Sequence, residues 1–526
     1  MQRTIRTAVL LAGLVLGSQS LLATDETPAD EVPAKPTPEE LKEQRSTTRG
    51  VVTIGGEPIP YSATVGDLIL RDEERNPVAK MVYVEYLRDD VESRVDRPVT
   101  FAFNGGPGSA SVWVHLGAFG PKKVLLDDEG WPTGPPPGRL VNNEYSLLDA
   151  TDLVFIDPVE TGWSRPLPAP EGEEAASFTG YSDDVAHVAE FIRLWLARND
   201  RLSSPKFIAG ESYGTTRAAG LAEFLQGRHG IFLNGINLIS SVLNWQTKVF
   251  NVGNDLPHVL ILPTMTATAW FHGKLPGRFE SLEGALREAE DFALTEYGPA
   301  LLLGERLPDE RRQALASRLA ELTGLSTDYV EATHLRPEIF RYAKEVLRDR
   351  ELTVGRLDSR YTGRDLDAAG ERFEFDPFFP VASGWYVALL KDYLRRELGY
   401  SSDDVFRQSA GGRIRPWNYH EKDRTQGYNT NAYANYAETL RSAMHVNPYL
   451  KVLVMSGYYD LATPYFATDY TVEHMQLAPE LRDNIWVEYY ESGHMMYVRR
   501  ADHAKFRRDF LKLIDEATTP GPMPGR

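Results

Sequence analysis

Six short apolar segments, spread along the chain, constrain its fold more than any other feature. In each, the apolar run is followed within two residues by Gly, Asp, Asn or Ser, and the segments read PVTFAFNGG, TDLVFIDP, PKFIAGES, INLISSVLN, KVLVMSGYYD and NIWVEYYESGH. Short continuous apolar runs are typical of parallel strands that are buried on both faces. Helical stretches such as DDVAHVAEFIRLWLARN and TRAAGLAEFLQG lie between several of them. This alternation predicts an α/β fold with a mostly parallel central sheet and flanking helices.

Two regions depart from that rhythm. Residues 50–92 contain short alternating segments, such as VVTIGG and AKMVYVEYLRD, that predict antiparallel strands separated by turns. Residues 245–429 are dominated by charge-rich helical segments, and we expect them to form a mostly helical cap inserted over the carboxyl edge of the sheet. The α/β core is then expected over residues 50–244 and 430–517.

The N-terminal residues predict export. Arg3 and Arg6 precede a short apolar run and a group of small residues, which is the pattern of a signal peptide over residues 1–23. Residues 24–49 are rich in Pro, Glu, Lys and Thr and predict a flexible tether. We therefore expect a periplasmic or extracellular protein, with no stable membrane insertion once the signal is removed.

Composition narrows the classes of function. The chain has no cysteine, which excludes disulfides, zinc–thiolate sites and thiol nucleophiles. A formal net charge of −18 argues against a nucleic-acid partner, which would favour a basic surface. No His, Asp or Glu cluster has the spacing of metal ligands and no nucleotide-binding loop is present, so we expect neither a metal nor a cofactor.

Ser212 is the candidate nucleophile. It stands in FIAGESYG, between Gly210 and Gly214, after an apolar strand and before a helix. A serine on such a sharp strand-to-helix turn requires little side-chain bulk on either side, and the helix N-terminus favours developing negative charge. A second loop, FNGGPGSASVW, follows another strand, and its backbone N–H groups are suited to stabilise an oxyanion.

A nucleophilic serine requires a base and an acid that orients the base. His494 follows the last apolar strand and Asp460 ends the strand before it, so the chain order Ser, Asp, His is that of an α/β-hydrolase triad. Among the other histidines, we expect His115 to be packed in an apolar segment. His474 and His503 are expected to cover the surface.

Five blocks together resemble the serine carboxypeptidase family, and specifically its cysteine-free bacterial relatives. They are NGGPGSAS at 104–111, LVFIDPVETGWS at 153–164, GESYG at 210–214, SGYYD at 456–460 and ESGHMMY at 491–497, in the order of the family. The resemblance implies the α/β-hydrolase fold and release of single C-terminal residues from peptides with a free C-terminus.

The resemblance also implies roles for further residues. Gly106 and Tyr213 would contribute backbone N–H groups to the oxyanion hole, and Asn104 and Glu211 would bind the terminal carboxylate of the substrate. One position departs from the family, because Ala118 stands where many members have a Glu that helps to hold that carboxylate.

Two other functions stay open at the level of sequence. An esterase or acyltransferase would use the same triad and the same acyl-enzyme. A non-catalytic binding protein on a hydrolase fold is disfavoured, because Ser212, Asp460, His494 and the glycine loop are all present.

Overall fold

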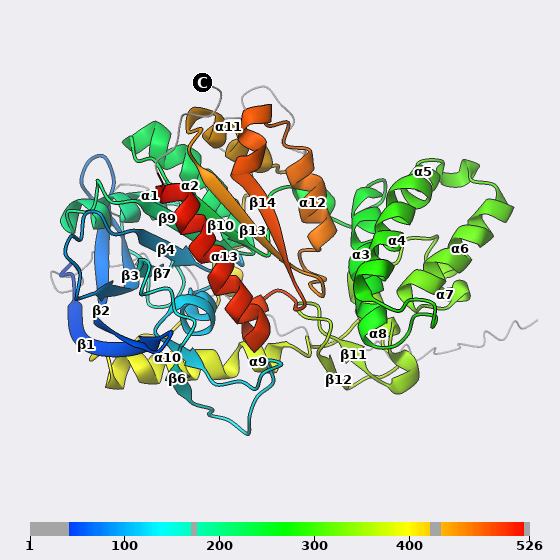
Figure 1. Ribbon diagram of the computed structural model, residues 1–526, viewed down its shortest axis with the longest axis horizontal. Coiled ribbons are helices and arrows are strands. Elements are labelled where there is room, and N and C mark those ends of the chain that lie inside the picture. The colour runs from blue at the N-terminus through cyan, green and yellow to red at the C-terminus, as the bar shows by residue number, and fades with distance from the viewer. Residues whose placement is uncertain (1–40, 170–175, 421–432, 520–526) are drawn as a thin grey trace, which may run out of the picture.

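The computed structural model describes residues 41–169, 176–420 and 433–519 (Figure 1). The expected signal peptide and most of the expected tether lie outside these ranges. Within the described ranges, no helix combines the length and apolar character needed to cross a bilayer.

One large sheet organises the molecule, with the strand order β1-β2-β3-β7-β4-β9-β10-β13-β14 and the short β8 paired to β3. The strands are β1 (Arg45–Ile54), β2 (Glu57–Arg71), β3 (Pro77–Arg88), β4 (Val99–Phe103), β7 (Asp152–Ile156), β8 (Arg165–Pro166), β9 (Lys206–Glu211), β10 (Gly235–Ile239), β13 (Lys451–Gly457) and β14 (Ile485–Tyr490). Two small two-stranded sheets pair β5 (Lys122–Val124) with β6 (Leu140–Asn142) and β11 (Thr353–Val354) with β12 (Thr362–Gly363).

The six strands from β7 to β14 in that order are parallel, and they are the six apolar runs of the sequence. The strands β1, β2 and β3 are antiparallel, as predicted. Because parallel strands end at one edge of a sheet, the residues that follow β4, β9, β13 and β14 gather there. The predicted fold class, an α/β-hydrolase fold with a mostly parallel sheet, is confirmed.

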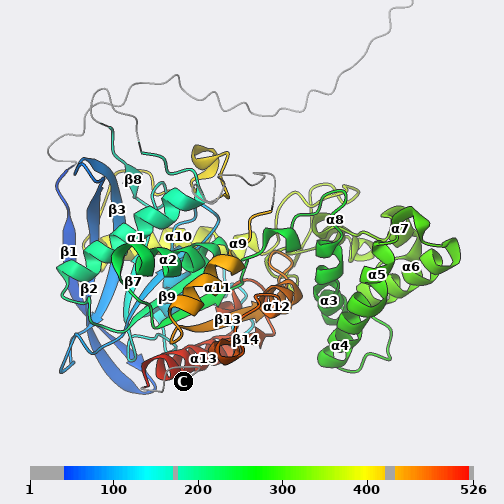
Figure 2. The ribbon, with the colours of Figure 1, turned by 90° about the horizontal axis from the view of Figure 1, so that it is seen from above.

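Helices cover both faces of the sheet (Figures 1 and 2). On one face, apolar side chains of α1 (Tyr181–Arg198), α2 (Tyr213–His229) and α11 (Ala437–Val446) share a core with the strands. On the other face, α13 (Arg500–Thr518), α10 (Gly384–Arg396) and the turn Val114–Phe119 build a second core. The helix α12 (Tyr465–Glu473) lies beside β13 and β14.

A helical lobe projects from the sheet's edge (Figure 1). It contains α3 (Leu256–Phe271), α4 (Leu282–Phe292), α5 (Gly298–Leu301), α6 (Asp309–Thr323), α7 (Thr327–Ala332) and α8 (Ile339–Glu345), which pack around a hydrophobic core of their own. Leu461, which follows Asp460, is buried in that lobe core.

The expected cap and tether boundaries both differ from the structure. In the expected cap, α9 (Phe379–Ala382) and α10 pack on the body because Trp385, Tyr386 and Tyr393 are buried in its core. In the expected tether, residues 45–49 already belong to β1, and Arg45 pairs with Gly66 of β2. The sequence did not predict this part of the strand, because one face of its first half is exposed and carries polar residues.

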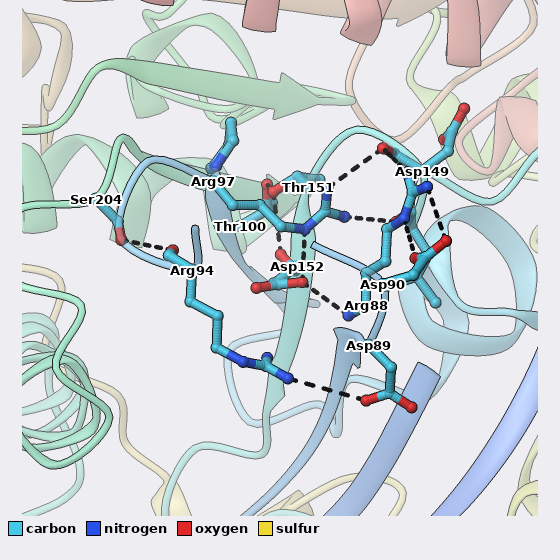
Figure 3. Close-up of polar contacts among 12 residues, drawn as sticks. Arg88, Asp89, Asp90, Arg94, Arg97, Thr100, Asp149, Thr151, Asp152 and Ser204 are labelled. Carbon is cyan, nitrogen blue, oxygen red and sulfur yellow. Dashed lines mark hydrogen bonds and ion pairs between the residues drawn. The ribbon is translucent and has the colours of Figure 1, made fainter. Parts of the chain in front are cut away.

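A buried ion network fixes the opposite, amino-terminal edge of the sheet (Figure 3). Asp152, the first residue of β7, has no exposed surface and accepts Arg97 Nε at 2.8 Å and Arg201 Nη1 at 2.7 Å. Its Oδ1 also accepts the backbone N–H of Arg88. The two arginines bond the carbonyls of residues that lead into β4 and β7, so this network ties three strands together far from the candidate site.

Candidate active site

Ser212 occupies the turn between β9 and α2, as predicted, and is half-buried. Its φ of 59° and ψ of −127° are strained for a residue other than glycine. The flanking glycines are required by packing, because a Cβ on Gly210 would lie 2.2 Å from the carbonyl oxygen of Gly214. The turn is held by the Ser212 N–H, which donates to the carbonyl of Ile239 at 2.9 Å.

The glycine loop after β4 lies directly against this turn. A Cβ on Gly105 would stand 2.4 Å from the backbone N of Tyr213 and 2.6 Å from that of Gly214. Gly106 is exposed and has a φ of +106°, a conformation that favours glycine. Within the described part of the chain, the N–H groups of Gly106 and Tyr213 have no acceptor, which leaves both available to an oxyanion.

Asp460 and His494 form a buried pair. His494 Nδ1 lies 2.6 Å from Asp460 Oδ2, and both side chains are almost completely buried. The other carboxylate oxygen accepts the N–H groups of Ala462 and Thr463. Burial alone would raise the pKa of Asp460, but His494 and the Thr463 bonds hold it below its ordinary value. Burial opposes the charged imidazole, yet Asp460 raises the pKa of His494.

The turn after β10 connects the histidine loop to the serine turn. Ile239 accepts the Ser212 N–H, and the next residue, Ser240, donates its hydroxyl to the carbonyl of His494 at 2.7 Å. The predicted triad residues therefore share one small region at the carboxyl edge of the sheet.

Glu211 and Asn104 form a second buried polar group beside Ser212. Asn104 Nδ2 donates to Glu211 Oε1 at 2.7 Å, and the Tyr497 hydroxyl donates to Glu211 Oε2 at 2.5 Å. Asn104 Oδ1 accepts the N–H groups of Trp113 and Val114, which fixes the amide orientation. Burial raises the pKa of Glu211 to about 7, so this carboxyl is protonated in mildly acidic solution.

Sequence reasoning did not identify the segment 357–360 of the insertion, which contacts both triad loops. Leu357 accepts the N–H of His494 at 2.7 Å, and Asp358 accepts the N–H of Gly493 at 2.9 Å. Ser359 donates its N–H to Tyr459, the residue before Asp460. A buried ion pair between Asp358 and Arg360 completes the segment. Its only sequence signal is a run of polar residues, which resembles an ordinary loop.

Predictions about individual side chains had mixed outcomes. His115 is packed as expected, stacked on Phe155 and bonded to Tyr86. His474 is exposed as expected. The expectation for His503 was wrong, because it is buried on α13 and bonds the carbonyl of Ala118 at 2.9 Å. Ala118 itself is buried in the core of the body.

The sequence contains two further aromatic segments that could line the cleft or pack in the cap, RPWNYH at 415–420 and GYNTNAYANY at 427–436. The Trp417 ring lies 5.5 Å from that of Tyr213, and the Tyr419 ring lies 4.4 Å from that of Trp245. Tyr213 is buried and bonds Asp184, so these contacts are packing behind the nucleophile turn. Most of the second segment, residues 427–432, lies outside the described residues.

Comparisons with known proteins agree with this geometry. Residues 76–249, which include the glycine loop and Ser212, match the family model described as serine carboxypeptidase. This part of the chain is thus similar to the serine carboxypeptidase family. Asp460 and His494 lie beyond the matched region, so their pairing rests on the geometry above.

Two curated relatives match the same part of the chain. The pheromone-processing carboxypeptidase KEX1 of Saccharomyces cerevisiae (strain JAY291) is 31% identical over 146 residues, which are 27% of this chain and 18% of KEX1. Serine carboxypeptidase-like 46 of Arabidopsis thaliana is 27% identical over 170 residues, 31% of this chain and 33% of that protein. The matches thus span a third or less of these relatives.

A solved structure extends the likeness in fold. The crystal structure of KEX1(delta)p, a prohormone-processing carboxypeptidase from Saccharomyces cerevisiae, superposes with a TM-score of 0.52 at 14% identity. The alignment covers 87% of this chain and 91% of that one, so the two proteins share their fold over most of their length.

Proposed function

We propose that this chain is an exported serine carboxypeptidase that releases C-terminal residues from peptides through an acyl-enzyme on Ser212. The observation that carries the proposal is the buried Glu211 carboxyl beside Ser212, hydrogen-bonded to Asn104 and Tyr497. A protonated carboxyl there can donate to a substrate carboxylate, whereas an ionised one would repel it. An esterase has no need of such a group.

In the proposed reaction, His494 Nε2 accepts the Ser212 proton while Oγ attacks the scissile carbonyl. The N–H groups of Gly106 and Tyr213 stabilise the resulting oxyanion, and Asp460 holds the imidazole through its 2.6 Å contact with Nδ1. His494 then protonates the departing amino group, which leaves an acyl-enzyme. Water, deprotonated by His494, attacks the acyl carbon and restores Ser212.

The proposed layout follows the sequence, with corrected boundaries. Residues 1–23 would direct export to the periplasm or the extracellular space, and the tether would end where β1 begins at Arg45. The α/β body would carry the triad, and the helical lobe would cover the carboxyl edge of the sheet.

The first experiment compares three substrates of the mature protein: an N-blocked dipeptide, its C-terminal amide and a simple ester. A carboxypeptidase cleaves the free acid in preference to the amide, and Ser212→Ala abolishes that cleavage. Rates are measured from acid to neutral pH. Equal cleavage of acid and amide would contradict the proposal.

One observation favours the alternative, an esterase or acyltransferase with the same triad. Ala118 is buried and contributes no carboxyl where many family members have a Glu. Cleavage of the ester alone in the same experiment would establish this function.

A further inference from the structure

A cavity of about 360 Å³ lies between the Asp460 loop and the helical lobe. It is lined by Thr247, Lys248, Phe250, Glu338, Ile339, Phe340, Arg356, Arg372, Leu461, Ala462 and Pro464. Three of these side chains are cations and one is a carboxylate, which gives the lining a formal charge of 3 − 1 = +2. Two further carboxylates act on these cations from outside the lining, because Asp460 raises the pKa of Lys248 and Asp376 interacts with the charge of Arg356.

Two of the cations have no carboxylate partner within the described ranges. The Lys248 ammonium lies over the Trp245 ring at 5.1 Å, and the Arg356 guanidinium lies 6.0 Å from the Phe340 ring. Arg372 is already paired with Glu338 at 3.4 Å. Lys248 and Arg356 therefore carry the excess charge.

The carboxylate of Asp376 forms no ion pair with Arg356 within the described residues. The charge of Asp376 acts on Arg356, but the Asp376 oxygens accept the backbone N–H groups of Arg356, Leu357 and Phe378. Arg356 thus keeps its capacity to bind another anion.

The charge of Arg356 affects both Lys248 and His494. Burial, followed by the positive charge of Arg356, lowers the pKa of Lys248 to about 8. Arg356 also opposes the charged form of His494. An anion bound between Lys248 and Arg356 would relieve this repulsion, which is a physical reason for the cavity to accept one.

The cavity adjoins the loop that follows Asp460 and does not include the residues expected to hold the terminal carboxylate. Its wall includes Leu461 and Ala462, and the Ala462 N–H donates to Asp460. Asn104 and Glu211 do not line it. A peptide bound at Ser212 that extended into this cavity would therefore place a second carboxylate there, one carried on a side chain.

We propose that Lys248 and Arg356 bind the side-chain carboxylate of an Asp or Glu residue near the scissile bond, which makes acidic peptides the preferred substrates. The inference rests on the proposed carboxypeptidase function and names the substrate class of the same site. The apolar Phe340 and Leu461 would contact the methylene part of that side chain.

The test compares pairs of N-blocked dipeptides. The two members of a pair differ only in having Glu or Gln, or Asp or Asn, at one position. The penultimate and the terminal position are varied in separate pairs. Wild type is expected to prefer the acidic member at one position by about tenfold in kcat/KM, the size of one charge-assisted hydrogen bond. Arg356→Gln and Lys248→Met should each bring the ratio of kcat/KM for the acidic member to kcat/KM for the amide member close to one, a ratio that cancels any effect of the substitution on His494. Arg364→Gln, an exposed cation of the same insertion, is the matched control.

Three results would overturn the inference while leaving the proposed function intact. In the first, wild type shows no preference for acidic peptides. In the second, the variants lose kcat/KM equally on acidic and neutral peptides. In the third, the variants change kcat/KM on neither kind of peptide. The second result would instead assign the cavity to the terminal carboxylate that every substrate carries.

Binding to Ser212→Ala, measured by calorimetry, tests the cavity separately from turnover. The Glu dipeptide should bind about tenfold more tightly than the Gln dipeptide, and Arg356→Gln in the same background should abolish the difference. Equal binding of the two peptides would contradict the inference. Loss of all cleavage with retained selective binding would contradict only the proposed function.

Discussion

Glu211 illustrates how the surroundings of one side chain determine its chemistry. It directly precedes Ser212, is buried, and accepts hydrogen bonds from Asn104 and Tyr497. These two bonds and the charge of His494 favour the ionised form, but burial outweighs them and raises the pKa to about 7. The carboxyl therefore changes charge near neutral pH.

The first prediction concerns the pH dependence of the proposed peptidase. In wild type, kcat/KM for a free-acid peptide should fall as pH rises through about 7, because ionised Glu211 repels the substrate carboxylate. Glu211→Gln, which cannot ionise, should lack this fall. An ester substrate without a carboxylate serves as the control, and an identical fall with the ester would contradict the assignment.

The second prediction concerns stability. The folded pKa of Glu211, about 7, lies above the ordinary glutamate value of 4.5, so between these values the folded state keeps a proton that the unfolded state loses. Stability should therefore decrease as pH rises from about 4.5 to 7, by roughly 3 kcal/mol from this group. Urea unfolding should show a flatter pH profile for Glu211→Gln, and equal profiles would contradict the prediction.

Motifs located some residues of the candidate site in the sequence, whereas other residues of the site had no sequence signal. Ser212, Asp460 and His494 meet at one edge of the sheet, as their positions after apolar strands indicated. Tyr497 and Asp358 could not be predicted, because their roles depend on contacts with residues more than a hundred positions away. His503 was misjudged because its helix is charged in sequence although it lies against the body.

At the scale of elements, two turns must approach closely for the site to exist. The glycine loop after β4 and the nucleophile turn after β9 leave no space for a side chain on Gly105. The parallel pairing of β4 with β9 brings the two turns to the same edge, so the strand register and the glycine act together.

The third prediction follows from that contact. Gly105→Ala should lower kcat/KM by about a hundredfold or more, because the new methyl group would displace the N–H groups of Tyr213 and Gly106. Gly134→Ala is the control, since a Cβ there meets no atom within 4 Å. Similar activities of the two variants would show that the loop adapts without cost.

The fourth prediction concerns segment 357–360, in which Asp358 is a positioning residue. Asp358→Asn should lower kcat by about tenfold or more with little change in KM, because the His494 loop loses its 2.9 Å anchor at Gly493. It should also destabilise the fold by about 3 kcal/mol, since Arg360 loses its buried partner.

Combining Asp358→Asn with Arg360→Gln separates the two effects. Stability should recover in the double variant, as measured by thermal unfolding, whereas kcat should remain low. Recovery of both quantities would assign Asp358 a structural role only.

The strands of the body were predictable because burial on both faces leaves an unbroken apolar run. The first half of β1 was not, since its exposed face carries polar residues that look like those of a tether. The packing of α10 on the body was likewise not predictable, because the sequence of an amphipathic helix does not show which hydrophobic core its apolar face joins.

At the scale of the whole molecule, stability and chemistry lie at opposite edges of the sheet. The carboxyl edge contains strained backbone at Ser212 and a carboxyl of raised pKa, whereas the amino edge contains the fully paired Asp152 network (Figure 3).

The fifth prediction tests that separation. Asp152→Asn should destabilise the protein by about 3–5 kcal/mol, because Arg97 and Arg201 would lose a buried partner. The KM and kcat of the folded variant should remain unchanged. Asp90→Asn, which removes an exposed pair with Arg88, should leave Tm unaltered, and an equal loss of Tm would contradict the prediction.

Because Leu461 is buried in the lobe core, the lobe is not an independent unit that could be exchanged between relatives. The residue that follows Asp460, the proposed acid of the triad, also belongs to the hydrophobic core of the lobe. A recombinant chimera that received a foreign lobe would need a matching residue at 461, although that position lies more than ninety residues beyond the last lobe helix. We therefore expect the lobe and the loop after Asp460 to be inherited together. A chimera that takes them from different relatives should fold with Asp460 displaced.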